Sequence, residues 1–347
     1  MDLREYLRKK NRNPAASYSF KPDNPELRKV YPGMSQPEIS EVIRENLSIT
    51  QGYEPYVQFK ERPFKGKFMN ADPRGFRSIG GEEKWPIDRD SFNIFVFGGS
   101  TAFGAAVPDN ETIAGYLKQG LREISNKPLA VYNFGRCSYM SIQERILLEQ
   151  LIISGNIPNL VIFIDGLNDF AHYKGVPAFT ENLTKFMNEG EKQGYQKLIE
   201  ALPATKFFLG SGGPKSEKQA ADSALTISDV ISRYKTNKKI TEAVCNEFEI
   251  KTLFVWQPTP MYNYDQSYTI FQKFDYDDFL PYVGPGYKAA AKEYQSGAFG
   301  SNFLWLGDMQ ENLREPLYVD AIHYSARMSN LIAKRIAVDL SEKKIIQ

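Results

Sequence analysis

Several features that mark large protein classes are scarce in this sequence. It has two cysteines in 347 residues, Cys137 and Cys245, far apart and without a CxxC pair. Neither a disulfide framework nor a zinc site is therefore expected. No stretch approaches the roughly eighteen apolar residues of a membrane-spanning helix, and the opening MDLREYLRKKNRNP lacks the apolar run of a signal peptide. We therefore expect a soluble, cytoplasmic protein without a transmembrane segment.

An excess of one charge is also absent. Lysine and arginine total 43 and aspartate and glutamate total 42, which gives a formal net charge of +1. A nucleic-acid-binding surface needs a basic excess or stripe, so no nucleic-acid partner is predicted. Histidine is scarcer still, because His172 and His323 are the only two in the chain. A mechanism that needs imidazole must use one of them.

What the sequence does contain begins with an N-terminal region of mixed character. Residues 1–50 are polar and weakly periodic and read as an arm, with a possible helix at Gln36–Asn46. Residues 53–78 mix aromatic side chains with turn residues, a pattern that favours short antiparallel strands. We assign residues 1–90 to an N-terminal arm and a small antiparallel extension.

From residue 93 onward, predicted strands alternate with predicted helices. The predicted strands are 93–97, 130–134, 159–165, 252–256 and 303–306. Their near-continuous apolar runs are typical of parallel strands covered on both faces. The alternation implies a three-layer α/β/α sandwich around a parallel, flavodoxin-like sheet, to which we assign residues 91–347. In such folds, ligands bind at the carboxyl ends of the strands.

The helices between these strands have clear sequence signals. Apolar residues keep helical spacing from Ile113 to Ile124. Ser141 and Glu144 match a capping box, which predicts that a helix begins there. A final helix is predicted over residues 326–344.

Two long insertions, at 170–228 and 257–300, interrupt the pattern and are predicted to border the site edge of the sheet. The first contains the glycine-rich stretch Gly210–Lys218. The second is crowded with aromatic residues. Its segment 257–284 could wall a substrate site by stacking on a sugar, and ordinary loop packing is the alternative.

The stretch FVFGGSTAFG ends the first of these strands in glycines and exposes a serine. A P-loop would require GxxxxGK[ST] and a dinucleotide turn GxGxxG, and neither pattern is present. The nucleophile pattern GxSxG matches Gly98 and Ser100 but meets Ala102 at its last position. A serine that only caps the following helix is the simpler alternative.

Three later segments favour a catalytic role for Ser100 over a helix cap. The second strand ends in Asn133-Phe-Gly135, the third in Asp165-Gly-Leu-Asn-Asp169, and Asp320-Ala-Ile-His323 follows the fifth. With Ser100, these segments resemble in order the four blocks of the SGNH hydrolases, also called the GDSL esterase/lipase family. The resemblance covers roughly residues 93–335. It implies an SGNH-type fold and ester chemistry.

The first block departs from the family's usual GDS, because Gly99 occupies the position of its aspartate. That aspartate is not part of the catalytic triad, and the chain resembles a GGST form found in bacterial relatives. The resemblance implies Ser100 as nucleophile, His323 as base and Asp320 as the partner of the imidazole. These residue types suit the chemistry, since serine must lose its proton to a neighbour and imidazole titrates near working pH.

The resemblance also implies an oxyanion hole. Its donors would be the backbone N–H groups of Ser100 and Gly135 and the side-chain amide of Asn168, which would stabilise charge that develops on the substrate oxygen. A glycine at 135 would let the substrate approach the backbone. No cofactor and no metal are implied.

Three further residues near the blocks have alternative interpretations. His172 is a loop histidine or a second base. Asp169 caps or buttresses its loop. Cys137 is a small buried hydrophobe or a thiol nucleophile.

The sequence therefore predicts a metal-independent serine esterase that acts through an acyl-enzyme intermediate. The predicted partner is a small-molecule or glycan ester with a short acyl group, such as O-acetyl on a carbohydrate. An acyltransferase that moves the acyl group to a sugar or other hydroxyl is the first alternative. A non-catalytic binding module is the second.

Overall fold

The computed structural model describes residues 24–81, 83–181, 183–184, 217–271 and 275–346. The first part of the predicted arm and most of the glycine-rich stretch at 210–218 lie outside the described residues. No helix in the described part of the chain is both long enough and apolar enough to cross a membrane.

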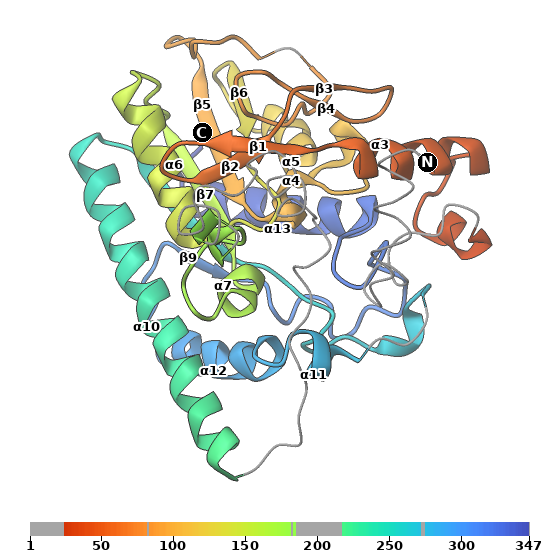
Figure 1. The fold of residues 1–347 in the computed structure, drawn as a ribbon. Coiled ribbons are helices and arrows are strands. Elements are labelled where there is room, and N and C mark those ends of the chain that lie inside the picture. Colours follow the sequence, from red (N-terminus) through yellow and green to blue (C-terminus); the bar gives the residue numbers. More distant parts are fainter. Residues whose placement is uncertain (1–23, 82, 182, 185–216, 272–274, 347) are drawn as a thin grey trace, which may run out of the picture.

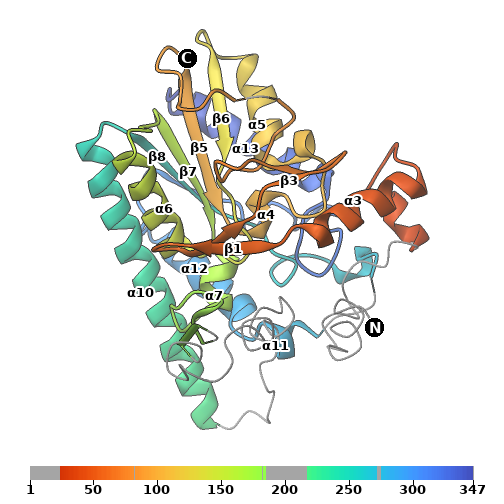
Figure 2. The ribbon, with the colours of Figure 1, turned by 45° about the horizontal axis from the view of Figure 1, so that its top comes forward.

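A parallel sheet of five strands forms the centre of the fold, in the order β6-β5-β7-β8-β9 (Figure 2). The strands are β5 (Phe92–Gly98), β6 (Leu129–Asn133), β7 (Leu160–Asp165), β8 (Lys251–Trp256) and β9 (Phe303–Trp305). All five predicted strands are confirmed to within one residue at each end. The predicted α/β/α sandwich is confirmed with them.

The two faces of the sheet carry different side chains because successive residues of a strand point to opposite sides. One face is aromatic, and its rings stack across neighbouring strands, with centroids 5.1 Å apart for Phe97–Phe163 and 5.2 Å apart for Phe163–Phe254. The other face is aliphatic and includes Ile94, Val96, Ile162, Ile164, Leu253 and Val255. Both sets are buried, which explains why the strands read as continuous apolar runs.

A layer of helices covers each face (Figure 1). The helices α5 (Ile113–Arg122) and α13 (Ala326–Glu342) pack on the aliphatic face. The aromatic face lies under α6 (Ser141–Ile153), α10 (Glu217–Glu247) and α12 (Val283–Gln295). Helix α10 was not predicted, and position 228, the predicted end of the first insertion, lies inside it.

The predicted capping box at the start of α6 is wrong. The helix begins at Ser141, its N-cap is Met140, and no side chain caps it. The Ser141 hydroxyl instead donates to Asp169 Oδ1 at 2.7 Å, and Glu144 is fully buried. Both side chains point into the core beneath the sheet edge, so tertiary contacts override the local pattern.

The predicted helix and the predicted short antiparallel strands of the N-terminal region are confirmed where the structure describes them. Helix α3 (Gln36–Ser48) follows the short helix η1 (Pro25–Lys29), and two antiparallel pairs come next. The pairs are β1 (Gln51–Glu54) with β2 (Gln58–Glu61), and β3 (Phe64–Lys65) with β4 (Asn70–Ala71). Side chains of η1 and α3 share a core cluster with Phe103 and Val319, so this region packs against the parallel-sheet domain.

The remaining elements are short. They are α4 (Ser100–Phe103), η2 (Asp109–Glu111), α7 (Leu167–Ala171), η4 (Gln266–Tyr268) and α11 (Tyr276–Phe279). Helices α4 and α7 directly follow β5 and β7, the two strands on either side of the point where the strand order reverses. Sites of doubly wound sheets form at this switch point.

Candidate active site

Ser100 is the first residue of α4, immediately after the carboxyl end of β5. The next residue, Thr101, fixes this helix, because its hydroxyl donates to Gln257 Oε1 at 2.7 Å. Gln257 follows β8, so the start of α4 is tied to the sheet two strands away. Ser100 itself is half-buried at the carboxyl edge of the sheet.

His323 and Asp320 complete a chain of two hydrogen bonds at Ser100. His323 Nε2 lies 2.9 Å from Ser100 Oγ, and His323 Nδ1 lies 2.7 Å from Asp320 Oδ2. The backbone N–H groups of Ile322 and His323 donate to Asp320 Oδ1 at 2.8 and 2.7 Å. The DxxH loop therefore orients its own carboxylate, and the carboxylate orients the imidazole.

The charges of this pair shift both pKa values. Burial alone would lower the pKa of His323, but the charge and hydrogen bond of Asp320 outweigh it and raise the pKa above its ordinary value. Burial alone would raise the pKa of Asp320, but His323 and the loop amides lower it. An ionised Asp320 beside a more basic imidazole suits proton transfer from a serine hydroxyl.

Asn168 lies on the other side of the nucleophile turn. It belongs to α7, and its Nδ2 donates to the Tyr139 carbonyl at 2.6 Å. A Cβ atom on Gly99 would lie 2.2 Å from this Nδ2, so only glycine at 99 lets the amide reach the start of α4. One of the two amide hydrogens remains for another acceptor.

The backbone of Gly135 is engaged within its own turn. Its N–H donates to Asn133 Oδ1 at 3.0 Å, so the structure does not show it as a free oxyanion donor. A Cβ at 135 would lie 2.3 Å from Phe103 N, so the missing side chain lets this turn pack against α4.

The other two predicted donors keep their places. The Ser100 N–H lies in the first turn of α4, where an N–H has no partner within the helix. Asn168 lies next to that turn through its contact with Gly99. The structure thus brings Ser100, His323, Asp320 and Asn168 together.

His172 has a different environment from His323. Its backbone N–H donates to the Asn168 carbonyl at 2.8 Å and closes α7. Burial lowers the pKa of the His172 imidazole to about 4, which keeps it neutral at physiological pH. The imidazole that contacts Ser100 is that of His323.

Asp169 buttresses its loop, as one interpretation of the sequence had it. Its carboxylate is buried and accepts the Ser141 hydroxyl, which joins α7 to the start of α6. Cys137 is half-buried, and its backbone N–H donates to Glu61 Oε1 at 2.8 Å. Burial raises the pKa of the Cys137 thiol, so the thiolate needed of a nucleophile is disfavoured.

The aromatic segment 257–284 packs on the protein where it is described. Tyr262 lies 5.8 Å from the Tyr287 ring, and Tyr282 lies 4.5 Å from the Tyr173 ring, measured between centroids. These rings are engaged in loop packing, the alternative that the sequence left open.

Metal clusters and grooves are the other places where chemistry could occur. Across the described ranges, no group of three or more His, Cys, Asp or Glu side chains is placed to hold a metal ion. A groove of about 1020 Å³ lies between α10 and α12, and its walls include Lys239, Lys288 and Lys292. None of the four blocks lines this groove, so it is separate from the Ser100 site.

Sequence reasoning missed the residues that support the nucleophile turn. Gln257 holds Thr101, and Asn133 holds both α4 and the turn at Gly135. Each of the two lies at the carboxyl end of a predicted strand, as the first three blocks do. That position was the one sequence signal that could have identified them.

Comparisons with solved structures give neighbours of low identity. Est24, a carbohydrate acetylesterase from Sinorhizobium meliloti, is 15% identical with a TM-score of 0.40, and the match covers 72% of this chain and 99% of that chain. The lipase Lip_vut3 from a goat rumen metagenome is 10% identical with a TM-score of 0.45, with 72% and 97% covered. The esterase EstA from Pseudoalteromonas sp. is 11% identical with a TM-score of 0.38, with 73% and 99% covered.

No protein-family model matches the sequence, and no curated protein matches it either. In its four blocks, and in the sheet edge where they meet, the chain resembles the SGNH hydrolases.

Proposed function

We propose that this chain is a serine esterase that cleaves an acyl ester through an acyl-enzyme intermediate. The observation that supports this most is the pair of hydrogen bonds that links Asp320 to His323 and His323 to Ser100. Three side chains from two segments far apart in the sequence, Ser100 on one and the Asp320–His323 pair on the other, have the mutual geometry that nucleophilic acyl transfer requires. An incidental helix cap at Ser100 would need neither the histidine nor its carboxylate.

In the first half-reaction, His323 Nε2 takes the Ser100 proton while Ser100 Oγ forms a bond to the ester carbonyl carbon. Asp320 stabilises the imidazolium that results. The tetrahedral intermediate then breaks its bond to the alcohol oxygen, and His323 gives its proton to that oxygen. A water molecule repeats the sequence on the acyl-enzyme, with His323 again as base, and releases the acid and free Ser100.

The negative oxygen of each tetrahedral intermediate needs donors that are already in place. We assign this role to the Ser100 N–H and to the second hydrogen of the Asn168 amide. The Ser100 N–H belongs to the turn that follows Gly99, and the Asn168 amide of α7 lies against the same turn. A fixed donor stabilises the developing charge without reorganisation, so it lowers the barrier more than it tightens substrate binding.

For the substrate, we propose a small-molecule or glycan ester with a short acyl group, such as O-acetyl on a carbohydrate. This choice follows from the resemblance to the SGNH hydrolases.

Acyl transfer to a sugar hydroxyl is the second candidate function, because the two long insertions that the sequence predicts at the site edge of the sheet would exclude water there. With p-nitrophenyl acetate as donor and a panel of sugars, a hydrolase releases acetate at a rate that does not depend on the sugar. Diversion of most of the acetyl group into a stable sugar ester would replace hydrolysis by transfer.

The direct test of the proposed function is labelling with a fluorophosphonate probe, followed by mass mapping of the modified residue. We expect stoichiometric labelling at Ser100 and none in a Ser100→Ala variant. A probe that leaves Ser100 unmodified in the folded protein would favour the non-catalytic binding module.

A further inference from the structure

Asn133 lies where the nucleophile helix, the second block and the N-terminal extension meet. It is the last residue of β6 and is completely buried. Its side-chain Nδ2 donates to the Ala102 carbonyl at 3.0 Å and to the Phe103 carbonyl at 3.4 Å. Its Oδ1 accepts the Gly135 N–H. One amide side chain therefore holds both the end of α4 and the turn of the second block.

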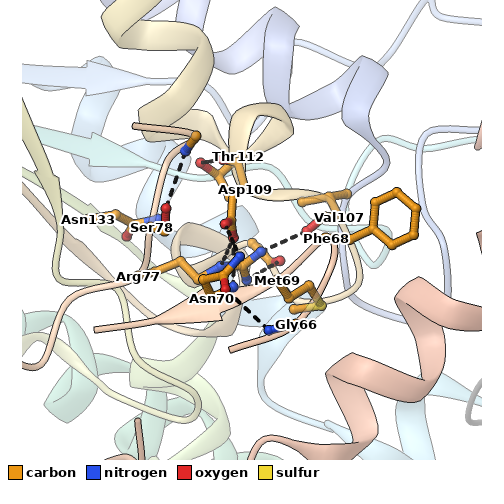
Figure 3. A network of polar contacts seen from close by, with 12 residues as sticks. Gly66, Phe68, Met69, Asn70, Arg77, Ser78, Val107, Asp109, Thr112 and Asn133 are labelled. Atoms are coloured by element: carbon orange, nitrogen blue, oxygen red, sulfur yellow. Dashed lines mark hydrogen bonds and ion pairs between the residues drawn. The ribbon is translucent and has the colours of Figure 1, made fainter. Parts of the chain in front are cut away.

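Arg77 reinforces the same end of α4 from the N-terminal extension (Figure 3). It is fully buried, and its guanidinium donates to the Gly104 carbonyl at 3.2 Å and the Val107 carbonyl at 2.9 Å. Its backbone N–H donates to the Asn133 carbonyl at 2.8 Å. Arg77 thus contacts Asn133 directly and also reaches the segment that follows α4.

The charge of Arg77 is balanced within the same network. Its Nε donates to Asp109 Oδ1 at 2.9 Å. The same carboxylate accepts the Asn70 backbone N–H at 2.9 Å and the Asn70 side-chain amide at 2.8 Å, which ties it to β4 (Figure 3). A buried ion pair with further hydrogen bonds at both ends holds its members in one arrangement.

The short length of α4 makes these contacts important. A helix of four residues cannot satisfy its last carbonyls internally, so outside donors fix where it ends and how its axis points. Ser100 is its first residue. A rotation at the Ala102–Gly104 end would therefore displace the hydroxyl that must stay in line with His323.

We propose that Asn133, held by Arg77, is a positioning residue for Ser100, and that the N-terminal extension is through this contact a working part of the active site. The proposal rests on the proposed function, since it assigns Asn133 a role in presenting the nucleophile. Asn133 touches no reacting atom. It acts through the carbonyls of α4 and through the Gly135 turn.

The test compares Asn133→Ala with a matched control, Asn93→Ala. Asn93 is 2% exposed and lies near the opposite, amino end of the sheet. Like Asn133, it donates two hydrogen bonds from Nδ2 to backbone carbonyls, those of Asp88 and Ser91. Both variants lose a buried amide, so urea unfolding should show comparable losses of stability.

Ester turnover should separate the two variants. Asn133→Ala should lower kcat roughly ten- to a hundredfold with KM within about threefold, because a small displacement of a nucleophile costs rate rather than binding. Asn93→Ala should keep kcat within about twofold. Equal kcat in Asn133→Ala and wild type, or equal losses in both variants, would overturn the proposal.

Hydrogen–deuterium exchange gives a readout that needs no turnover. Amides of the 99–106 segment should exchange faster in Asn133→Ala than in wild type and be unaltered in Asn93→Ala. Unaltered exchange in both would also overturn the proposal. If the wild type neither hydrolyses esters nor labels at Ser100, the proposed function fails, while this comparison still decides whether Asn133 holds α4.

A second variant covers the case in which Asn133→Ala does not fold. Arg77→Lys keeps a positive charge beside Asp109 but loses the planar fork that reaches two carbonyls at once. It should show the same fall in kcat at nearly constant KM and the same faster exchange at 99–106. Wild-type values in a folded Arg77→Lys variant would count against the proposal.

Discussion

At the scale of single residues, the proposed mechanism makes the reactivity of Ser100 depend on the charge state of the imidazole 2.9 Å away. Only a neutral His323 can accept the serine proton. Because Asp320 raises the pKa of His323 above its ordinary value of 6.5, activity should rise with pH across a range above that value. The ascending limb of kcat/KM against pH reports this titration in the free enzyme.

Replacing Asp320 by asparagine should move that limb. Without the carboxylate, burial is the dominant influence that remains on His323, and burial lowers its pKa. Asp320→Asn should therefore shift the limb to lower pH and lower kcat by about four orders of magnitude. The measurement is kcat/KM between about pH 5 and 9. A limb at the wild-type position would mean that Asp320 does not control the imidazole.

Asn168 gives a second prediction at this scale. Its amide would bind charge that exists only in the transition state, so Asn168→Ala should lower kcat by roughly a hundred- to a thousandfold and leave KM nearly unchanged. Steady-state kinetics on a p-nitrophenyl ester measure both. A raised KM at unaltered kcat would make Asn168 an ordinary substrate contact.

At the scale of secondary-structure elements, helix α7, which carries Asn168, also contributes to a buried cluster of carboxyl groups. Glu144 of α6, Asp165 of β7 and Asp169 of α7 are at most 6% exposed. Burial raises the pKa of Glu144, and the charge of Asp165 raises it further. The folded protein therefore holds a proton on Glu144 at pH values where the unfolded chain has released it.

This difference makes stability depend on pH. For an acid whose pKa is higher in the folded state, stability is lost as pH rises from the unfolded to the folded pKa, by about 1.4 kcal/mol for each pH unit between them. Glu144→Gln keeps the shape and cannot ionise. It should therefore gain stability over wild type at pH 8, and the gain should shrink toward pH 4.5, the ordinary pKa of a glutamate.

Urea unfolding at the two pH values measures this change. The control is Glu123→Gln, a change of the same kind at an exposed position. A Glu144→Gln effect that is equal at both pH values, or matched by the control, would show that the buried cluster does not titrate as described.

At the scale of the whole molecule, the parts that followed from sequence are those set by local periodicity. The five strands were predictable because every one is buried on both faces, and the helix at 326–342 because its apolar residues keep one stripe. Ser100 and Asn168 were placed correctly just after strand ends because parallel strands all end at one edge, and Asp320–His323 lie as expected in the loop after the fifth strand.

The parts that did not follow depend on contacts between distant segments. The local sequence from Ser141 to Glu144 matches a capping box, but the Glu144 side chain is buried in the core beneath α7. The Asn133 side chain that accepts the Gly135 N–H also donates to the Ala102 carbonyl of α4, and this second contact joins separate segments of the chain. Arg77 reads as a surface charge, since arginine is seldom buried, and only the assembled network around Asp109 accounts for its position.

The two histidines allow the most direct test of the central claim, that Ser100 is activated by His323. Turnover of a p-nitrophenyl ester is measured for His323→Gln and His172→Gln, with circular dichroism as the control for folding. Loss of the triad base should lower kcat by about four to six orders of magnitude, whereas His172→Gln should stay within about tenfold of wild type. An active His323→Gln protein beside an inactive His172→Gln protein would contradict the assignment of the DxxH loop and the proposed function with it.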